Sequence, residues 1–275
     1  MTVALRHFWR FHCHLTESRQ RLDDALARGG GDGHSQTLAW SALALTAYYQ
    51  GDYVGARRYE EESLRLSREL RLADRIASGL SNLGMITQAE GDNRSARSLL
   101  EESLKKAREI NDAVLIAQPI HNLSDLALEE GDFGRARELA TEALLRWRSV
   151  GDLEGISLAL VNLGLAAIEL GALREAERLL RDALVAGKEL GSPVAIGACL
   201  DGLAAIAVRD GKATSKRAAP GLRTLPAPPT LISTGAPVNV PLKIEPISLL
   251  RFAPQETGPS TFETTCWWSP IDLVA

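Results

Sequence analysis

The chain has little cysteine and no long apolar run, and both absences exclude classes of protein. Among its 275 residues the cysteines are Cys13, Cys199 and Cys266, and three thiols so far apart fit free cysteines in a reducing compartment better than a disulfide framework. No apolar run reaches the ~18 residues of a membrane-spanning helix. The amino terminus carries Arg6 and Trp9 where a signal peptide needs an apolar core. We therefore expect a cytoplasmic protein with no membrane partner.

The chain also lacks the positive charge that a nucleic-acid surface needs. Its formal net charge is −4 at pH 7 and its pI is about 5.8. Proteins that bind nucleic acids directly cluster Lys and Arg so that they replace phosphate counterions. We therefore expect no direct nucleic-acid partner.

Proline is scarce before residue 211 and frequent after it. Ten of the twelve prolines lie between Pro220 and Pro270, and proline forbids a long helix through such a stretch. The net charge also changes, from −6 in residues 1–211 to +2 in residues 212–275. We predict a Pro-rich, largely disordered tail at 212–275, which is either a native linker or an altered reading frame of further repeat.

A unit of 40 residues recurs through the rest of the chain. A fixed period of this length is typical of a stack of identical supersecondary units. The residues that keep step with it are glycines, alanines and leucines: Gly51, Gly91, Gly131, Gly171 and Gly211; Ala56, Ala96, Ala136 and Ala176; Leu64, Leu104, Leu144 and Leu184; and Leu83, Leu123, Leu163 and Leu203.

Each unit is predicted to be a pair of antiparallel helices. In the second unit, apolar residues recur at spacings of three and four over residues 74–90 and again over residues 93–110. Gly91 ends the first helix and Asp92 caps the second. We predict an amino-terminal capping hairpin at 1–35, repeats at 36–72, 73–112, 113–152 and 153–192, and an incomplete repeat at 193–211.

Two places depart from this pattern. Arg71 and Leu72 stand where other units have a helix stop followed by an N-cap residue. Pro119 falls inside the predicted first helix of the third unit, where it removes a backbone hydrogen bond. That helix is therefore expected either to start late or to kink, with a distorted groove beside His121 and Asn122.

The motifs resemble those of the tetratricopeptide repeat family. They are Asn82-Leu83-Gly84, Asn162-Leu163-Gly164 and the variant Asn122-Leu123-Ser124, each followed by the recurring glycine and alanine. The resemblance implies an all-α, right-handed superhelical solenoid whose first helices line a concave groove. The 40-residue length is similar to the longer version of the repeat in bacterial regulators and kinesin-light-chain-like scaffolds. The amino-terminal stretch also resembles the entry to the repeat arm of bacterial signal-transduction ATPases.

The resemblance also implies where a ligand would lie. In this family the Asn of the Asn-Leu-Gly motif often holds the backbone of a bound peptide, which points to Asn82, Asn122 and Asn162. The alternative is that these asparagines tie neighbouring helices together. The same mapping places a set of inner-wall residues in the groove: Tyr48, Tyr49, Ser78, Ser81, Met85, Gln118, His121 and Asp125, with Leu158, Val161 and Leu165 as groove or core residues.

Neither metal chemistry nor catalysis has support in the sequence. Cys13 and the nearby histidines lack the spacing that would close a tetrahedral site. The stretch from Gly211 to Ser215 lacks the first glycine of a phosphate-binding loop and follows a helix. We expect no cofactor, no metal and no enzymatic activity.

The sequence therefore favours a non-enzymatic scaffold that binds a protein or peptide. The alternative is a sensor arm of a multidomain bacterial ATPase-type transcriptional regulator, with its output domains elsewhere. The last repeat lacks its second helix, because the proline-rich tail follows, and its remaining helix is apolar on most sides. Self-association through that uncapped helix is a further possibility to test.

Overall fold

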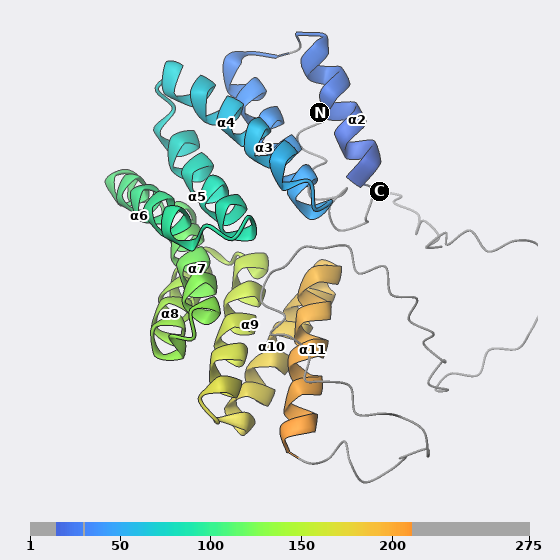
Figure 1. Cartoon of the computed structure of the whole chain (residues 1–275), viewed down its shortest axis with the longest axis vertical. Coiled ribbons are helices and arrows are strands. Elements are labelled where there is room, and N and C mark those ends of the chain that lie inside the picture. Colours follow the sequence, from blue (N-terminus) through green and yellow to red (C-terminus); the bar gives the residue numbers. More distant parts are fainter. Residues whose placement is uncertain (1–14, 30, 211–275) are drawn as a thin grey trace, which may run out of the picture. The chain divides into compact units, whose positions relative to one another are not determined.

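The computed structural model describes residues 15–29 and 31–210, and the regular structure in those ranges is entirely helical. The helices are α2 Leu15–Ala27, α3 Gly33–Tyr49, α4 Tyr53–Glu69, α5 Ala73–Ala89, α6 Asn93–Ile110, α7 Ala113–Glu129, α8 Phe133–Val150, α9 Leu153–Glu169, α10 Leu173–Leu190 and α11 Pro193–Arg209 (Figure 1). The all-α fold is thus confirmed, and α5 and α6 match the helices predicted at 74–90 and 93–110. The predictions for residues 1–14 and 211–275 lie outside the described residues.

Consecutive helices form antiparallel pairs, which we name by their order in each unit. The A helices are α3, α5, α7, α9 and α11, and the B helices are α4, α6, α8 and α10. Each B helix packs against the A helix before it and the A helix after it. Successive A helices also contact one another, from α3·α5 to α9·α11. The A helices therefore form a continuous layer, and α3 begins at Gly33, three residues before the predicted start of the first repeat.

The turns explain why the helices end where they do. Gly51, Gly91, Gly131 and Gly171 all have positive φ, between 77° and 90°, which ends each A helix without strain on a side chain. Asp52, Asp92 and Asp132 then accept a hydrogen bond from the backbone N–H three residues later, which caps the following B helix.

The junction at Arg71 has neither a glycine at the helix end nor a side-chain N-cap, as the sequence predicts. Arg71 has φ 56°, a left-handed conformation that the equivalent Gly151 and Gly191 adopt without a side chain. Leu72 occupies the N-cap position of α5 and makes no side-chain hydrogen bond there. Ser192 caps α11 at the corresponding position.

Small residues set the distance between the helices of a pair. A Cβ added to Gly84 would lie 2.6 Å from Leu100 Cδ2, and one added to Gly164 would lie 2.7 Å from Leu180 Cγ. Leu100 and Leu180 are themselves fully buried. The leucine of the B helix therefore packs directly on the backbone of the A helix, which requires glycine at that position.

Helix α7 does not start late. It runs from Ala113 to Glu129 with Pro119 inside it, and Asp112 caps its amino terminus through the N–H groups of Val114 and Leu115. Pro119 is among the most deeply buried side chains. The missing backbone donor is therefore accommodated within one continuous helix.

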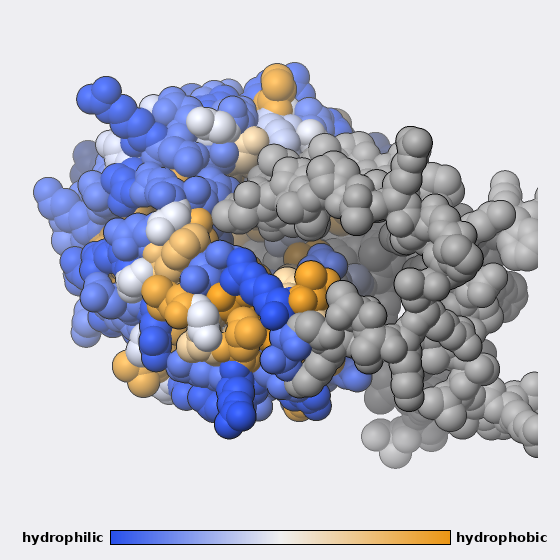
Figure 2. Space-filling view, turned by 60° about the horizontal axis from the view of Figure 1, so that its bottom comes forward, coloured by the Kyte–Doolittle hydropathy of each residue, from blue (hydrophilic) through white to orange (hydrophobic). Residues whose placement is uncertain are grey.

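The surface is mostly polar, and arginines connect neighbouring units. Arg57 on α4 pairs with Glu90, and Arg97 on α6 pairs with Glu130 in the same way one unit later. The view in Figure 2 shows hydrophilic side chains around a limited hydrophobic patch. In residues 15–29 and 31–210, no helix combines the length and apolar character needed to cross a bilayer.

Candidate functional site

The exposed faces of the A helices form one wall, which we call the A wall. Most predicted groove residues lie on it and are partly exposed: Tyr48, Tyr49, Ser78, Asn82, Met85, Gln118, Asn122 and Asp125. Ser81, His121 and Asn162 are buried instead. Of the apolar residues, Leu158 and Leu165 are partly exposed, whereas Val161 is buried in the core.

The three asparagines donate hydrogen bonds to the preceding unit. Asn82 Nδ2 donates to Ser41 Oγ at 3.1 Å, and Asn122 Nδ2 donates to Ser81 Oγ at 3.1 Å. Asn162 Nδ2 contacts His121 Nδ1 at 3.3 Å and donates to Asp125 Oδ1 at 2.5 Å. Each asparagine thus connects residues about one repeat apart. These donors are used in stacking, and only Asn82 and Asn122 are exposed enough for their Oδ1 acceptors to be within reach of a ligand.

The central polar cluster of the A wall is built on α7 and α9. His121 is 9% exposed, and its ring centroid lies 5.4 Å from that of Trp147 on α8. Its Nε2 lies 3.4 Å from Asp125 Oδ2 one turn later. His121 is therefore a packed residue that connects the core to the carboxylate of Asp125. A site for general base catalysis would also need a nucleophile, and none is adjacent to it in the described contacts.

A second polar cluster lies at the junction of the first two units, and the sequence analysis did not identify it. Glu60 on α4 is fully buried, and its Oε2 accepts hydrogen bonds from Ser41 Oγ at 3.1 Å and from Asn82 Nδ2 at 3.2 Å. Its Oε1 is buried with no hydrogen-bond partner. Burial raises the pKa of Glu60 to about 7, while Asn82, Ser41 and the charge of Arg75 oppose that rise.

The 40-residue register contains a signal for this cluster. The positions equivalent to Glu60 are Leu100, Ala140 and Leu180, all of which are apolar and buried. Because this position is apolar in the other units, the carboxyl group of Glu60 stands out in the sequence as a polar group in the core. The 40-residue register is enough to locate Glu60, but its hydrogen bonds to Ser41 and Asn82 can be seen only in the structure.

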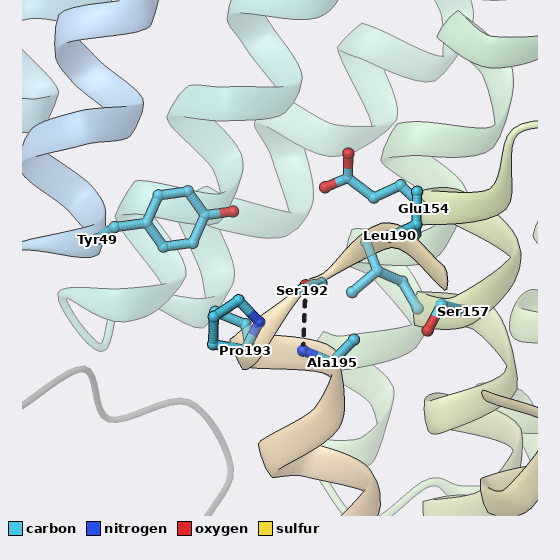
Figure 3. A pocket seen from close by; sticks show the side chains of 9 residues that line it. Tyr49, Glu154, Ser157, Leu190, Ser192, Pro193 and Ala195 are labelled. Carbon is cyan, nitrogen blue, oxygen red and sulfur yellow. Dashed lines mark hydrogen bonds between the residues drawn. The ribbon is translucent and has the colours of Figure 1, made fainter. Parts of the chain in front are cut away.

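A small pocket lies between the end of α3 and the start of α9 and α11. Its lining is mainly apolar, and the one charged residue in it is Glu154: the lining comprises Tyr49, Glu154, Ser157, Leu158, Leu190, Ser192, Pro193, Val194 and Ala195. Figure 3 shows the Tyr49 ring reaching from α3 towards Glu154. The hydroxyl groups of both serines in the pocket make hydrogen bonds within the protein. Ser157 Oγ donates to the carbonyl of Ala183, and Ser192 Oγ accepts from the N–H of Ala195.

The aromatic end of the A wall includes the tyrosines predicted there. The Tyr48 ring lies 5.5 Å from Tyr49 and 5.6 Å from Tyr53, measured between centroids. Trp40 stacks on Tyr59 at 5.9 Å on the same hairpin. Tyr59 is buried, whereas Trp40, Tyr48, Tyr49 and Tyr53 are partly exposed, and aromatic rings of this kind suit the recognition of another polypeptide.

The rest of the described chain offers little reactive chemistry. Within residues 15–29 and 31–210, no group of three or more His, Cys, Asp or Glu side chains is placed to hold a metal ion. Cys199 on α11 is buried, and burial raises the pKa of its thiol to about 11. The thiolate that would react is therefore scarce at neutral pH.

Comparison with known families agrees with the geometry. Models of the tetratricopeptide repeat match residues 41–71, 75–149 and 115–189. The chain belongs to the tetratricopeptide repeat family. In this tetratricopeptide repeat protein the matched ranges together cover the second half of α3 and nearly all of α4 to α10. No curated protein has a matching sequence.

Solved structures share the repeat fold at low sequence identity. BtubC (BKLC) from P. vanneervenii is 21% identical with a TM-score of 0.53, over 69% of this chain and 79% of that one. A Rap protein in complex with Competence and Sporulation Factor is 14% identical with a TM-score of 0.61, over 76% and 64%. Aspartyl phosphate phosphatase F from Bacillus subtilis is 12% identical with a TM-score of 0.60, over 77% and 58%. The tetratricopeptide repeat chain thus spans about three fifths of the last two proteins.

Proposed function

We propose that this chain is a non-enzymatic scaffold that binds a peptide or a helix along the A wall. The observation that supports the proposal is that the two faces of the A helices differ. One face of each A helix packs against B helices, and the other carries side chains that stay partly exposed, including Met85, Gln118 and Asn122. Partly exposed side chains on such a face can contact a bound polypeptide.

The asparagines contribute acceptors to this surface in the proposal. Asn82 and Asn122 are partly exposed and lie one repeat apart, with their Nδ2 groups fixed on the preceding unit. A fixed amide presents its oxygen in one direction, where it can accept a hydrogen bond from the N–H of an extended peptide. Asn162 is 4% exposed and acts in this scheme mainly by holding Asp125 in place.

One of the similar structures supports a polypeptide ligand. The Rap protein that shares this fold is in complex with Competence and Sporulation Factor. The alternative function, a sensor arm of a bacterial regulator, would use the same wall to receive an effector. A binding experiment on this chain therefore tests the property that both functions need.

The test is a selection of phage-displayed random 12-residue peptides on the immobilised chain. Peptides that bind the wild type are then measured on Gln118→Trp, which places a bulky ring on the A wall, and on Lys105→Trp, an exposed position on α6. We expect Gln118→Trp to weaken binding by about tenfold or more and Lys105→Trp to leave it unchanged. Failure to select any peptide, or equal binding to both variants, would overturn the proposal.

A further inference from the structure

Helix α11 is the A helix of an incomplete unit, and one side of it is not covered. The helices α5, α7 and α9 each pack against the B helix of their own unit and against the next A helix. Among the described helices, α11 packs against α9 and α10, both of which precede it. Because each unit of a repeat stack buries the apolar surface of its neighbour, the side of α11 that faces away from α10 lacks this cover.

The 40-residue register identifies the residues on that side. In the complete units, a small residue at the centre of the A helix contacts the B helix of the same unit. A Cβ added to Gly84 would lie 2.6 Å from Leu100 Cδ2 on α6, and Ser124 Oγ donates to the carbonyl of Ala136 on α8 at 2.9 Å. The equivalent residue of α11 is Ala204, which is exposed. Ala204 therefore marks a place where the other units have a B helix.

Two larger apolar residues lie one turn before and one turn after Ala204. Leu200 is 53% exposed and Val208 is 66% exposed. The equivalent residues of α5, α7 and α9 are at most 6% exposed: Leu80, Ile120 and Leu160, and Gln88, Leu128 and Ile168. A spacing of four places Leu200, Ala204 and Val208 on one side of the helix, which we call the open face. Its exposure to water is unfavourable, so a helix that covers it stabilises the end of the stack.

The open face is complementary to a second copy of itself. Leu200 and Val208 are symmetric about Ala204, so an antiparallel pair of α11 helices sets Ala204 against Ala204 and Leu200 against Val208. The small residue at the crossing allows the two helices to approach closely. The charged residues of α11 are Asp201 and Arg209, and neither belongs to the open face. A two-fold pair through an uncharged stripe therefore avoids setting like charges against each other.

The other end of the described stack does not match the open face. Helix α2 stands at that end, and ion pairs lie on its exposed side, between Glu17 and Arg21 and between Asp24 and Arg28. Head-to-tail packing would press the open face onto these charged side chains and remove them from water, which is costly. Apolar surface meets apolar surface only when α11 pairs with α11.

We propose that two copies of this chain form a two-fold symmetric dimer in which their α11 helices pack antiparallel through Leu200, Ala204 and Val208. The second copy's α11 takes the place that a B helix has in the complete units. Cys199 and Ile206 already join α11 to the apolar core of its own stack, so the dimer makes the two cores continuous. The interface forms without a bound peptide, and the dimer presents two A walls in one particle.

The first experiment measures the mass of the full chain by light scattering during size exclusion at about 100 μM. We expect twice the 29.7 kDa of one chain. Leu200→Glu places a carboxylate in the interface twice, so we expect it to weaken the dimer by at least about a hundredfold and to give the monomer mass. The matched control is Leu145→Glu, because Leu145 is 63% exposed on α8, and this variant should remain dimeric. Circular dichroism establishes that both variants are folded.

The second experiment tests the two-fold geometry with a single cysteine. Ala204→Cys is made in a chain that also carries Cys13→Ser and Cys266→Ser, while Cys199 is kept because it is buried. An antiparallel crossing at residue 204 brings the Cα atoms of the two copies within the roughly 4.4–6.8 Å of a disulfide, so mild oxidation should give a covalent dimer. Leu145→Cys in the same background should give none.

The results separate a second copy from other covers of the open face. A monomeric wild type overturns the proposal, and the rate at which a maleimide labels Ala204→Cys then identifies the cover. Slow labelling indicates a segment of the same chain, and rapid labelling indicates a face that is open to a different protein. A dimer that persists in Leu200→Glu, or a lack of cross-linking in Ala204→Cys, also contradicts pairing through α11.

Discussion

Replacement of the buried Glu60 by Gln should raise the stability of the chain above neutral pH and have little effect at pH 5. Glu60 is fully buried, with Oε1 unpartnered, and its pKa in the folded state is raised from 4.5 to about 7. In the unfolded state the pKa returns to its ordinary value. Between those two pKa values the unfolded chain loses a proton that the folded chain keeps, so the free energy of unfolding falls as pH rises.

The size of the effect follows from the shift. A shift of one pKa unit corresponds to about 1.4 kcal/mol, so ionising Glu60 in the folded protein costs about 3 kcal/mol by pH 8. Gln keeps an oxygen that can accept from Ser41 and Asn82 but has no charge to desolvate. The variant should therefore gain about 2 to 3 kcal/mol relative to wild type between pH 5 and pH 8, or roughly 5–10 °C in Tm.

The assay is thermal unfolding of wild type and Glu60→Gln by circular dichroism at half-unit steps from pH 5 to pH 9. The control is Glu61→Gln on the same helix, because Glu61 is exposed and its carboxylate lies 3.7 Å from Arg57. Hydrogen exchange of α3 to α5 reports whether the effect is local to the first two units, as expected for a repeat stack. A difference in Tm that stays constant over this pH range would refute the reasoning.

Three more substitutions test the stack itself, each by its change in Tm. Pro119→Ala should raise Tm, because a gain of about 3 kcal/mol in helix propensity exceeds the roughly 1–2 kcal/mol of lost burial; a lower Tm would contradict it. Arg71→Gly should raise stability by about 1 kcal/mol, since φ at this position is 56°, and no gain would mean that the side chain compensates. Gly155→Ala should cost about 2 kcal/mol or more, because its Cβ would lie 2.1 Å from Cδ2 of the Trp147 indole; an unchanged Tm would show that the ring moves freely.

The sequence predicted the fold well because the determinants of each helix are local. The bounds of α5 and α6 follow from apolar spacing, a glycine stop and an aspartate cap, all within one stretch of chain. The anomaly at Arg71 was visible for the same reason. Pro119 was different, because its effect depends on whether the surrounding helices hold α7 together, and in the structure α7 is continuous around it.

The site was less predictable because it depends on contacts between repeats. The asparagines were assigned to the wall from their motif, but their hydrogen bonds to Ser41, Ser81 and Asp125 join residues about one repeat apart. The pocket beneath Tyr49 joins the first repeat to the last two, and no sequence spacing relates those positions. A motif predicts the face of a helix on which a residue lies. The side chains that this residue contacts depend on how the neighbouring repeats pack.

Charges are distributed unequally between the two kinds of helix: the five A helices carry six carboxylates and two arginines, and the four B helices carry thirteen carboxylates and seventeen lysines and arginines. B helices hold the stack with arginines that reach the next unit, as Arg57 reaches Glu90, so their positive charge is partly consumed in structure. Among the described A helices, one arginine reaches the preceding unit in this way, Arg209 on α11, which pairs with Glu169 on α9. Apolar contacts and small residues also hold these helices together. The A helices thus carry few charges, and four of their six carboxylates lie on α7 and α9. Charge is therefore a minor part of what holds the A helices together.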